Sequence, residues 1–289
     1  MLPNRRACLA LALLTLLGGC AQAAPPSQTQ AAAADLDNLR AAAAWLGPEA
    51  AACAAAPPAG WSQAGLQLLA EQAPQWSAAL EAEAQAKTAP PSQAKPAAGD
   101  CPLADLERDL ARVETLSWRV AEARGDGGTV AVAIGRAARL AEAIGLGSLE
   151  GAPAPETADL ANLPAETLAS LALAQDQAGF VGEQLAAQTG DAALRAELEA
   201  AAGRHRACGE ELTAMAGGLD LRAVAYQLDA PPADEAATRQ RWAAVQLALA
   251  SHYAALPISA GVEAWVHWQL GQAYAAGASL PALPFADPA

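Results

Sequence analysis

The sequence predicts an all-α protein, with a four-helix bundle at its C-terminal end and a smaller helical region before it. Three observations carry this prediction. The chain is 53% hydrophobic but only 4% aromatic, and it is rich in Ala and Leu, which favour helix over strand. Pro and Gly divide it into helix-sized segments. Within the segments, apolar residues recur in steps of three and four, the period of a helix with one buried face.

Residues 1–19 have the parts of an export signal. Arg5 and Arg6 form a positive start, and the apolar stretch that follows is too short to span a bilayer. The stretch ends in Leu17-Gly18-Gly19-Cys20, which resembles a bacterial lipobox. The resemblance implies cleavage between Gly19 and Cys20 and lipidation of Cys20, whereas the alternative is an ordinary signal with a coincidental cysteine.

Arg5 and Arg6 also resemble a twin-arginine signal, so the sequence leaves both the Sec and the twin-arginine export routes open. We expect the protein to be exported and lipid-anchored to the cell membrane or envelope, facing away from the cytoplasm. A net charge of −14 excludes nucleic acid as a partner and disfavours attachment to anionic lipid through Lys and Arg. The membrane is therefore expected to be reached through the lipid on Cys20, and the other partner to be an unidentified envelope protein or a small ligand.

The N-terminal part of the mature chain is expected to be a tether over residues 20–34 and a helical region over residues 35–145. The tether is polar and contains the pair Pro25-Pro26. The helical region is punctuated by Gly47-Pro48, where the first helix should stop, and by Pro74. The second helix is either one long helix or two pieces, with the break expected at Pro74. The predicted helices are 35–46, 60–87, 103–123 and 129–145. A linker is expected over residues 146–162.

Three cysteines remain for structure once Cys8 is removed and Cys20 is lipidated: Cys53, Cys101 and Cys208. Export permits a disulfide, and three thiols allow three single pairings. We favour Cys53 with Cys101, because each lies at the edge of an irregular segment containing Pro. Cys208 is then expected to be a buried thiol. No Cys-x-x-Cys occurs, which argues against a thiol redox enzyme or a zinc ribbon.

The last part of the chain, residues 163–289, is expected to form the bundle. Its predicted helices are 163–188, 191–216, 234–256 and 259–277. The first and last pairs have short connections, which only antiparallel neighbours allow. The middle connection is about 17 residues long, enough to run the length of a bundle. Two hairpins with one long crossover is the connectivity of ferritin-like bundles.

Several segments over about residues 163–285 also suggest a family: LALAQDQAGFVGEQL, HRACGEEL, AYQLDAPPADEAA, LASHYAALP and SLPALPF. In order and spacing they are similar to a ferritin-like domain family of unknown function found in bacterial exported lipoproteins. The resemblance implies a ferritin-like bundle and no established activity. The family's Glu-His in its first helix matches Gln175-Asp176 here, and its later His-Arg matches His205-Arg206. A carboxylate is therefore missing where a metal ligand would stand.

The candidate site in this bundle is a buried polar cluster of Gln175, His205 and His252, which the helical periodicity places inward. A di-iron site needs about four acids and two histidines, including Glu-x-x-His on two helices, and no Glu-x-x-His occurs. We therefore expect a hydrogen-bonded cluster that fixes helix register, with no metal and no cofactor. Glu263 and His267 could share a metal, but an isolated pair four residues apart is typical of a surface contact.

No catalytic residue is predicted. The chain has three histidines and no Gly-x-Ser-x-Gly turn, so a Ser-His-Asp catalytic triad is not expected. The segment GDGGTVAVAIG lacks the spacing of a phosphate loop and is expected to cap a helix. A group of aromatic residues has helical spacing typical of a bundle core, although a ligand pocket is an alternative: Trp242, Tyr253, Trp265 and Trp268.

The function expected from the sequence is non-catalytic binding or scaffolding by a lipid-anchored envelope protein. Two alternatives stay open. One is a metal-dependent oxidase or iron-handling protein with a non-standard site around His205 and His252. The other is a solute-binding lipoprotein with an apolar pocket between the two helical halves.

Overall fold

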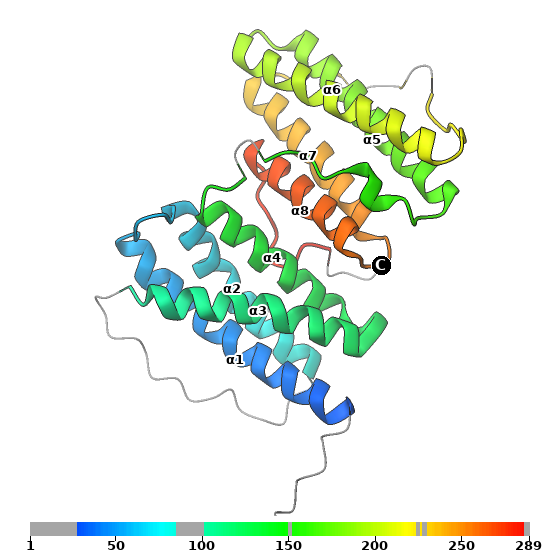
Figure 1. Ribbon diagram of the computed structural model, residues 1–289. Coiled ribbons are helices and arrows are strands. Elements are labelled where there is room, and N and C mark those ends of the chain that lie inside the picture. The colour runs from blue at the N-terminus through cyan, green and yellow to red at the C-terminus, as the bar shows by residue number, and fades with distance from the viewer. Residues whose placement is uncertain (1–27, 85–100, 150–151, 224–225, 227–229, 286–289) are drawn as a thin grey trace, which may run out of the picture.

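The structure is a computed structural model that describes residues 28–84, 101–149, 152–223, 226 and 230–285 (Figure 1). In these residues every regular element is a helix, which confirms the all-α prediction. The predicted signal, its cleavage site and Cys20 lie outside the described residues. The α-helices are α1 (Gln28–Ala55), α2 (Gln63–Ala84), α3 (Leu103–Arg124), α4 (Thr129–Gly145), α5 (Ala165–Gln188), α6 (Ala192–Met215), α7 (Glu235–Ala254) and α8 (Ala260–Ala275). Two 3-10 turns are η1 (Gly125–Gly128) and η2 (Thr157–Leu160).

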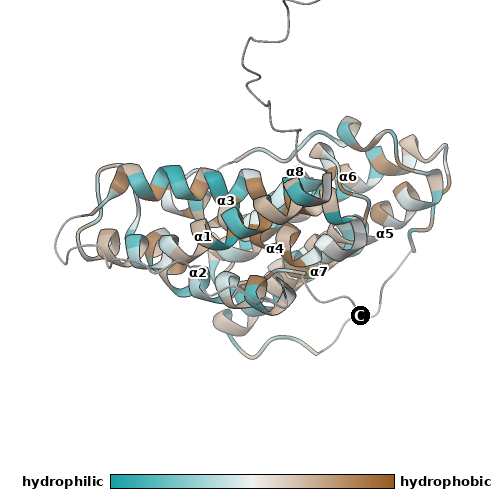
Figure 2. Cartoon of the chain, turned by 90° about the horizontal axis from the view of Figure 1, so that it is seen from below, coloured by the Kyte–Doolittle hydropathy of each residue, from teal (hydrophilic) through white to brown (hydrophobic). Residues whose placement is uncertain are grey.

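Helices α1 to α4 form the N-terminal half, in which α1 packs on α2 and α3, and α4 packs on the same two helices from the other side. Their shared core is mostly aliphatic and includes Leu39, Leu46, Leu69 and Leu80, with Trp61 and Trp76 as its largest side chains. Helix α3 buries one stripe of Leu and Val and carries its hydrophilic residues on the outer side (Figure 2). This stripe is the signal that predicts the helix from its sequence.

Two helix boundaries predicted from Pro and Gly are wrong. Helix α1 starts at Gln28, within the segment expected to be a tether, and continues through Pro48 to Ala55. Helix α2 runs unbroken through Pro74. The two interruptions face each other, since a Cβ on Gly47 would lie 3.2 Å from the Pro74 ring. Close packing of α1 on α2 at this point offsets the hydrogen bond that each proline removes from its helix.

The Cys53–Cys101 disulfide is formed, as favoured from the sequence. It ties the C-terminal end of α1 to the residue two positions before α3. It therefore closes a covalent loop that contains α2 and has a sequence separation of 48 residues.

Helices α5 to α8 form the C-terminal half as two hairpins, α5 with α6 and α7 with α8. At one end Gly182 of α5 lies beside Ala202 of α6 and Trp242 of α7. At the other end Gln175 contacts His205 and Tyr253. Helices α6 and α7 are thus both antiparallel to α5 and parallel to each other. Between them in the sequence, Tyr226 lies against α5, where its hydroxyl donates to Asp176 and its ring packs on Phe180.

The two halves share an interface built on α4 and α8. Leu140 and Ile144 of α4 belong to the core of the C-terminal half. The C-terminal segment then returns to the N-terminal half, where Gln72 Nε2 donates to the Leu280 carbonyl (3.3 Å) and Trp76 Nε1 donates to the Ala282 carbonyl (2.7 Å). The region before residue 145 therefore packs on the bundle. No helix among the described residues is both long and apolar enough to cross a bilayer.

Candidate functional site

Two of the three residues predicted for the polar cluster meet in the core of the C-terminal half. His205 Nδ1 lies 2.6 Å from Gln175 Oε1, and the side chains of both residues are buried, with 2% and 0% of the residue surface exposed. Gln175 Nε2 also donates to the Tyr253 hydroxyl at 2.8 Å. The cluster therefore links α5, α6 and α7 through directional hydrogen bonds.

The third predicted residue, His252, is exposed, so the prediction for it is wrong. Its place is taken by Gln246, whose Nε2 lies 3.1 Å from His205 Nε2. The error comes from the register of α7. Its buried stripe runs through Trp242, Gln246, Leu249 and Tyr253, and Trp242 and Leu249 are common to both readings of the sequence. A stripe through Tyr253 is as regular as one through His252, so the pattern of apolar residues alone did not separate them.

The hydrogen bonds fix the protonation of the His205 ring. An amide nitrogen only donates, so the His205 Nε2 that faces Gln246 accepts, and Nδ1 carries the proton that it donates to Gln175 Oε1. Burial, with a smaller effect of the Arg204 charge, lowers the pKa of His205 to about 4. The ring is neutral at physiological pH and has both nitrogens occupied, which suits a structural group better than a general base or a metal ligand.

Aromatic side chains and a thiol fill the rest of this core. Tyr253 stacks on Trp265 with ring centroids 5.2 Å apart, and Trp265 meets Trp268 edge to face at 5.7 Å. Cys208 is buried and free, and burial raises its pKa to about 12, so its thiol is unreactive. The aromatic group predicted from the sequence is therefore core packing in the C-terminal half.

The acids next to Gln175 and near His267 are paired with arginines. Asp176, next to Gln175, accepts hydrogen bonds from Arg206 and from the Tyr226 hydroxyl. Glu263 accepts two from Arg136, at 2.6 and 2.9 Å. The pair of Glu263 with His267 is thus not a shared ligand set. In the part of the chain that the structure describes, no three His, Cys, Asp or Glu side chains are grouped so as to hold a metal.

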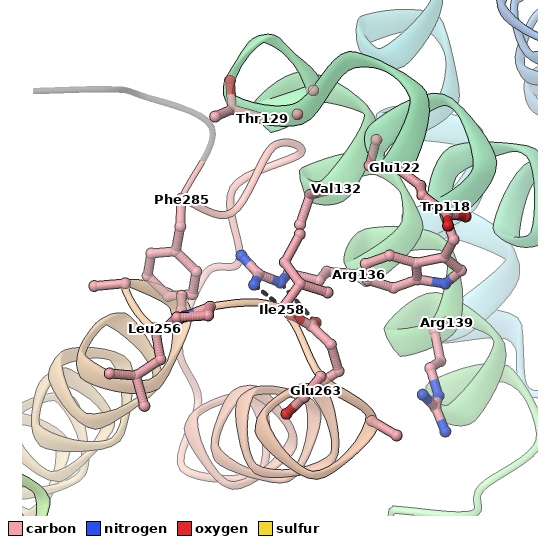
Figure 3. Close-up of a pocket in the computed structure, with 18 residues that line it drawn as sticks. Trp118, Glu122, Thr129, Val132, Arg136, Arg139, Leu256, Ile258, Glu263 and Phe285 are labelled. Atoms are coloured by element: carbon pink, nitrogen blue, oxygen red, sulfur yellow. Dashed lines mark hydrogen bonds and ion pairs between the residues drawn. The ribbon is translucent and has the colours of Figure 1, made fainter. Parts of the chain in front are cut away.

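A cavity of about 1030 Å³ opens where the two halves meet (Figure 3). One wall comes from the end of α3, from η1 and from α4, and the other from the loop between α7 and α8 and the first turn of α8. Figure 3 shows Trp118 and Phe285 on opposite sides, with the ion pair of Arg136 and Glu263 between them. The wall also contains the apolar side chains of Val132, Leu256 and Ile258.

Close backbone packing positions the aromatic side chains of this junction cavity. A Cβ on Gly135 would lie only 3.3 Å from the Trp118 indole, so Gly135 lets the indole lie across α4. Phe285 adopts a φ of 60°, a left-handed conformation that is rare for a residue with a Cβ. Such a conformation persists where surrounding contacts hold it, and Phe285 packs against the core of the C-terminal half.

The charges on the cavity wall are distributed unevenly. Arg136 and Glu263 are both buried and neutralise each other. Arg139 lies 4.0 Å from Glu114, a residue outside the cavity. Glu122 is exposed and has no hydrogen-bond or ion-pair partner among the described residues. Among its described residues, the wall therefore carries one carboxylate without a counter-ion.

The sequence did not indicate the residues of this cavity, although a pocket between the halves was one of its open alternatives. Arg136 and Glu263 are separated by 127 residues, so no local pattern joins them. Both segments that flank the cavity, the Gly-rich η1 and the Pro257-Ile258 loop, read as simple turns. Comparison of the chain with protein family models, with curated proteins and with solved structures finds no match.

Proposed function

We propose that this chain is a lipid-anchored, non-catalytic binding protein of the cell envelope, and that it binds a small solute in the junction cavity. The observation that carries the proposal is the cavity itself. Its volume of about 1030 Å³ is at the upper end of the range typical of small-molecule sites, about 300–1,000 Å³. Its wall is mostly apolar, with a few charged side chains, which is the composition of such sites.

The ferritin-like resemblance is kept as part of this proposal. It is supported by two antiparallel hairpins whose second and third helices run parallel. A metal-dependent oxidation around His205 and His252 is not proposed, because His252 faces solvent and the nearby Asp176 is bound to Arg206. In our proposal the bundle is a scaffold whose α7–α8 end forms one wall of the solute site.

Export and anchoring are part of the proposal and rest on the sequence before α1. The Cys53–Cys101 disulfide supports an oxidising compartment. Replacing Cys20 by Ala should move the protein from the membrane fraction to the soluble fraction, because acyl chains on this residue would supply the attachment. A Cys20→Ala protein that stays in the membrane fraction would contradict lipidation at this residue.

The binding proposal is tested by a thermal-shift screen of small molecules on the purified full chain, since a ligand that binds the native state raises the Tm. Each hit is then titrated by calorimetry against the Ala255→Trp variant, whose new side chain would fill the cavity at an exposed wall position. The matched control is Ala248→Trp, at an exposed position of α7 outside the cavity wall. Hits that bind both variants equally well would refute the cavity as the solute site.

A further inference from the structure

We propose that the junction cavity binds an organic cation, an ammonium group joined to an apolar or aromatic body. This inference rests on the proposed function and specifies the class of solute. It is carried by three features of the wall: two aromatic side chains, a band of aliphatic side chains and one carboxylate without a counter-ion.

The apolar part of the wall favours a ligand with an apolar or aromatic body. Trp118 and Phe285 face the cavity from opposite sides (Figure 3). Ile258, on the cavity wall, has 55% of its surface exposed, the largest exposed fraction of any large hydrophobic residue that the structure describes. A ligand with an apolar body would remove this side chain from water, and each Å² of apolar surface so buried stabilises the complex by about 25 cal/mol.

The charges of the wall favour a positively charged ligand. The Arg136 guanidinium is paired with the other acid of the wall, since Nε and a terminal nitrogen both donate to Glu263. The positive charge of Arg139 acts on two acids outside the cavity, Glu114 and Glu142. Among the described charged side chains of the wall, Glu122 is then the one whose charge has no partner of opposite sign. A bound anion would therefore compete with existing acids for Arg139, whereas a bound cation would gain an unpaired partner.

Trp118 and Glu122 are placed to act on the same cation. They are four residues apart on α3 and both line the cavity, and side chains at this spacing have Cβ atoms about 6 Å apart on one face of a helix. An ammonium over the face of an indole gains about 0.5–2 kcal/mol of cation–π attraction, and the adjacent carboxylate adds a charge of opposite sign. The net charge of −14 attracts cations to the protein as a whole.

The test uses three probes of one shape: benzyltrimethylammonium, its carbon isostere neopentylbenzene, and the anion phenylmethanesulfonate. They are titrated by calorimetry into the purified full chain at low ionic strength, where charge effects are largest. We expect the cation to bind at least about tenfold more tightly than either of the other two probes, a difference of about 1.4 kcal/mol. Ala255→Trp should abolish its binding.

Substitutions on α3 separate the cavity charge from the overall charge. Glu122→Gln should weaken the cation about tenfold, and Glu122→Lys should reverse the preference toward the sulfonate. The control Glu199→Gln removes the same charge from an exposed position on α6, outside the cavity, and should leave the affinity within about twofold. Glu122 is exposed, so circular dichroism is expected to show that its variants fold.

The outcomes distinguish the class of solute from the existence of a solute site. If the neutral or anionic probe binds most tightly and Ala255→Trp abolishes that binding, the cavity is a solute site and the cation inference is wrong. If the cation binds equally well to the wild type, Glu122→Gln and Ala255→Trp, it binds elsewhere and the inference is wrong. If none of the three probes binds, the inference is likewise refuted, and the separate library screen decides whether the proposed function stands.

Discussion

The two halves of the molecule use similar helical patterns but hold their cores together by different means. In the N-terminal half the core is aliphatic, with Leu39, Leu46 and Leu66 fully buried, and a disulfide closes it covalently. In the C-terminal half a chain of hydrogen bonds runs from Gln246 through His205 to Gln175 and on to Tyr253. A helical bundle rich in Ala and Leu can therefore gain a single helix register in two ways: from a disulfide and close apolar packing, or from directional hydrogen bonds.

The largest effect is expected from a substitution that weakens the interface between the two halves. Glu263→Gln leaves the Arg136 charge buried at the interface without a full counter-ion, and breaking such a pair costs about 3–5 kcal/mol. In urea unfolding followed by circular dichroism, the free energy of unfolding should fall by this amount. The single transition should split into two, one for each half. The double variant Arg136→Met/Glu263→Leu should recover most of the stability, because apolar residues of similar size replace the pair. A single transition shifted by less than about 1 kcal/mol would show that the ion pair does not join the halves.

The next test removes the covalent constraint from the N-terminal half. Loss of the disulfide in Cys53→Ser/Cys101→Ser frees a loop with a sequence separation of 48 residues. On the chain-entropy model this costs about 4 kcal/mol, which thermal unfolding of the variant would measure. A reducing agent should destabilise the wild type in the same way and leave the variant unchanged, since Cys208 is a buried free thiol. Equal sensitivity of the two proteins to the reducing agent would contradict this account.

A smaller effect is expected from the polar centre of the C-terminal half. His205→Leu removes the partner of Gln175 Oε1 and the partner of Gln246 Nε2, and an unsatisfied buried group costs about 1–3 kcal/mol. We expect a total loss of about 2–3 kcal/mol in urea unfolding. The control is His252→Leu, an exposed position on α7 that should change stability by less than about 0.5 kcal/mol. Equal effects of the two substitutions would restore the register predicted from the sequence.

The smallest effect is a difference in how the halves respond to pH. Burial, together with the charges of Asp109 and Asp105, raises the pKa of Glu49 in the N-terminal half to about 7. Its folded form holds a proton more tightly than its unfolded form, so its contribution to stability is lost as the pH rises from about 4.5 to about 7. Glu49→Gln should therefore stabilise the protein at pH 8 by about 1 kcal/mol, and have almost no effect near pH 4.

His205 in the C-terminal half acts with the opposite sign. Burial lowers its pKa from about 6.5 to about 4, so its unfolded form binds a proton first and stability is lost as the pH falls through that range. Urea unfolding from pH 4 to pH 8 on Glu49→Gln and His205→Leu would separate the two contributions. Parallel pH profiles for the two variants would contradict the assignment of opposite signs.

Most of the helices could be predicted from the sequence, because apolar residues in steps of three and four mark a buried face wherever they occur. The helix over residues 129–145 was predicted to the residue. The boundaries at Gly47-Pro48 and Pro74 could not be predicted, because both are decided by how α1 and α2 pack on each other. Intrinsic preference is a weak guide where tertiary contacts outweigh it.

The candidate sites were harder to predict than the fold. Gln175 and His205 were found because they interrupt apolar stripes, whereas Gln246 was missed because two stripes of equal regularity pass through Trp242 and Leu249. The junction cavity depends on residues more than a hundred positions apart, such as Arg136 and Glu263. Each reads locally as an ordinary charge on a helix surface, so the three-dimensional arrangement was needed to join them.

The return of the C-terminal segment to α2 has a consequence for the order in which the molecule is completed. Helix α2 is synthesised long before Leu280 and Ala282, the residues whose carbonyls accept hydrogen bonds from Gln72 and Trp76. Until Leu280 and Ala282 have been made, these two side chains have no native acceptor. The first helices can collapse early, but this part of their surface is completed only after those residues have been added. A chain that stops before Leu280 would thus leave the earliest-made part of the protein unfinished.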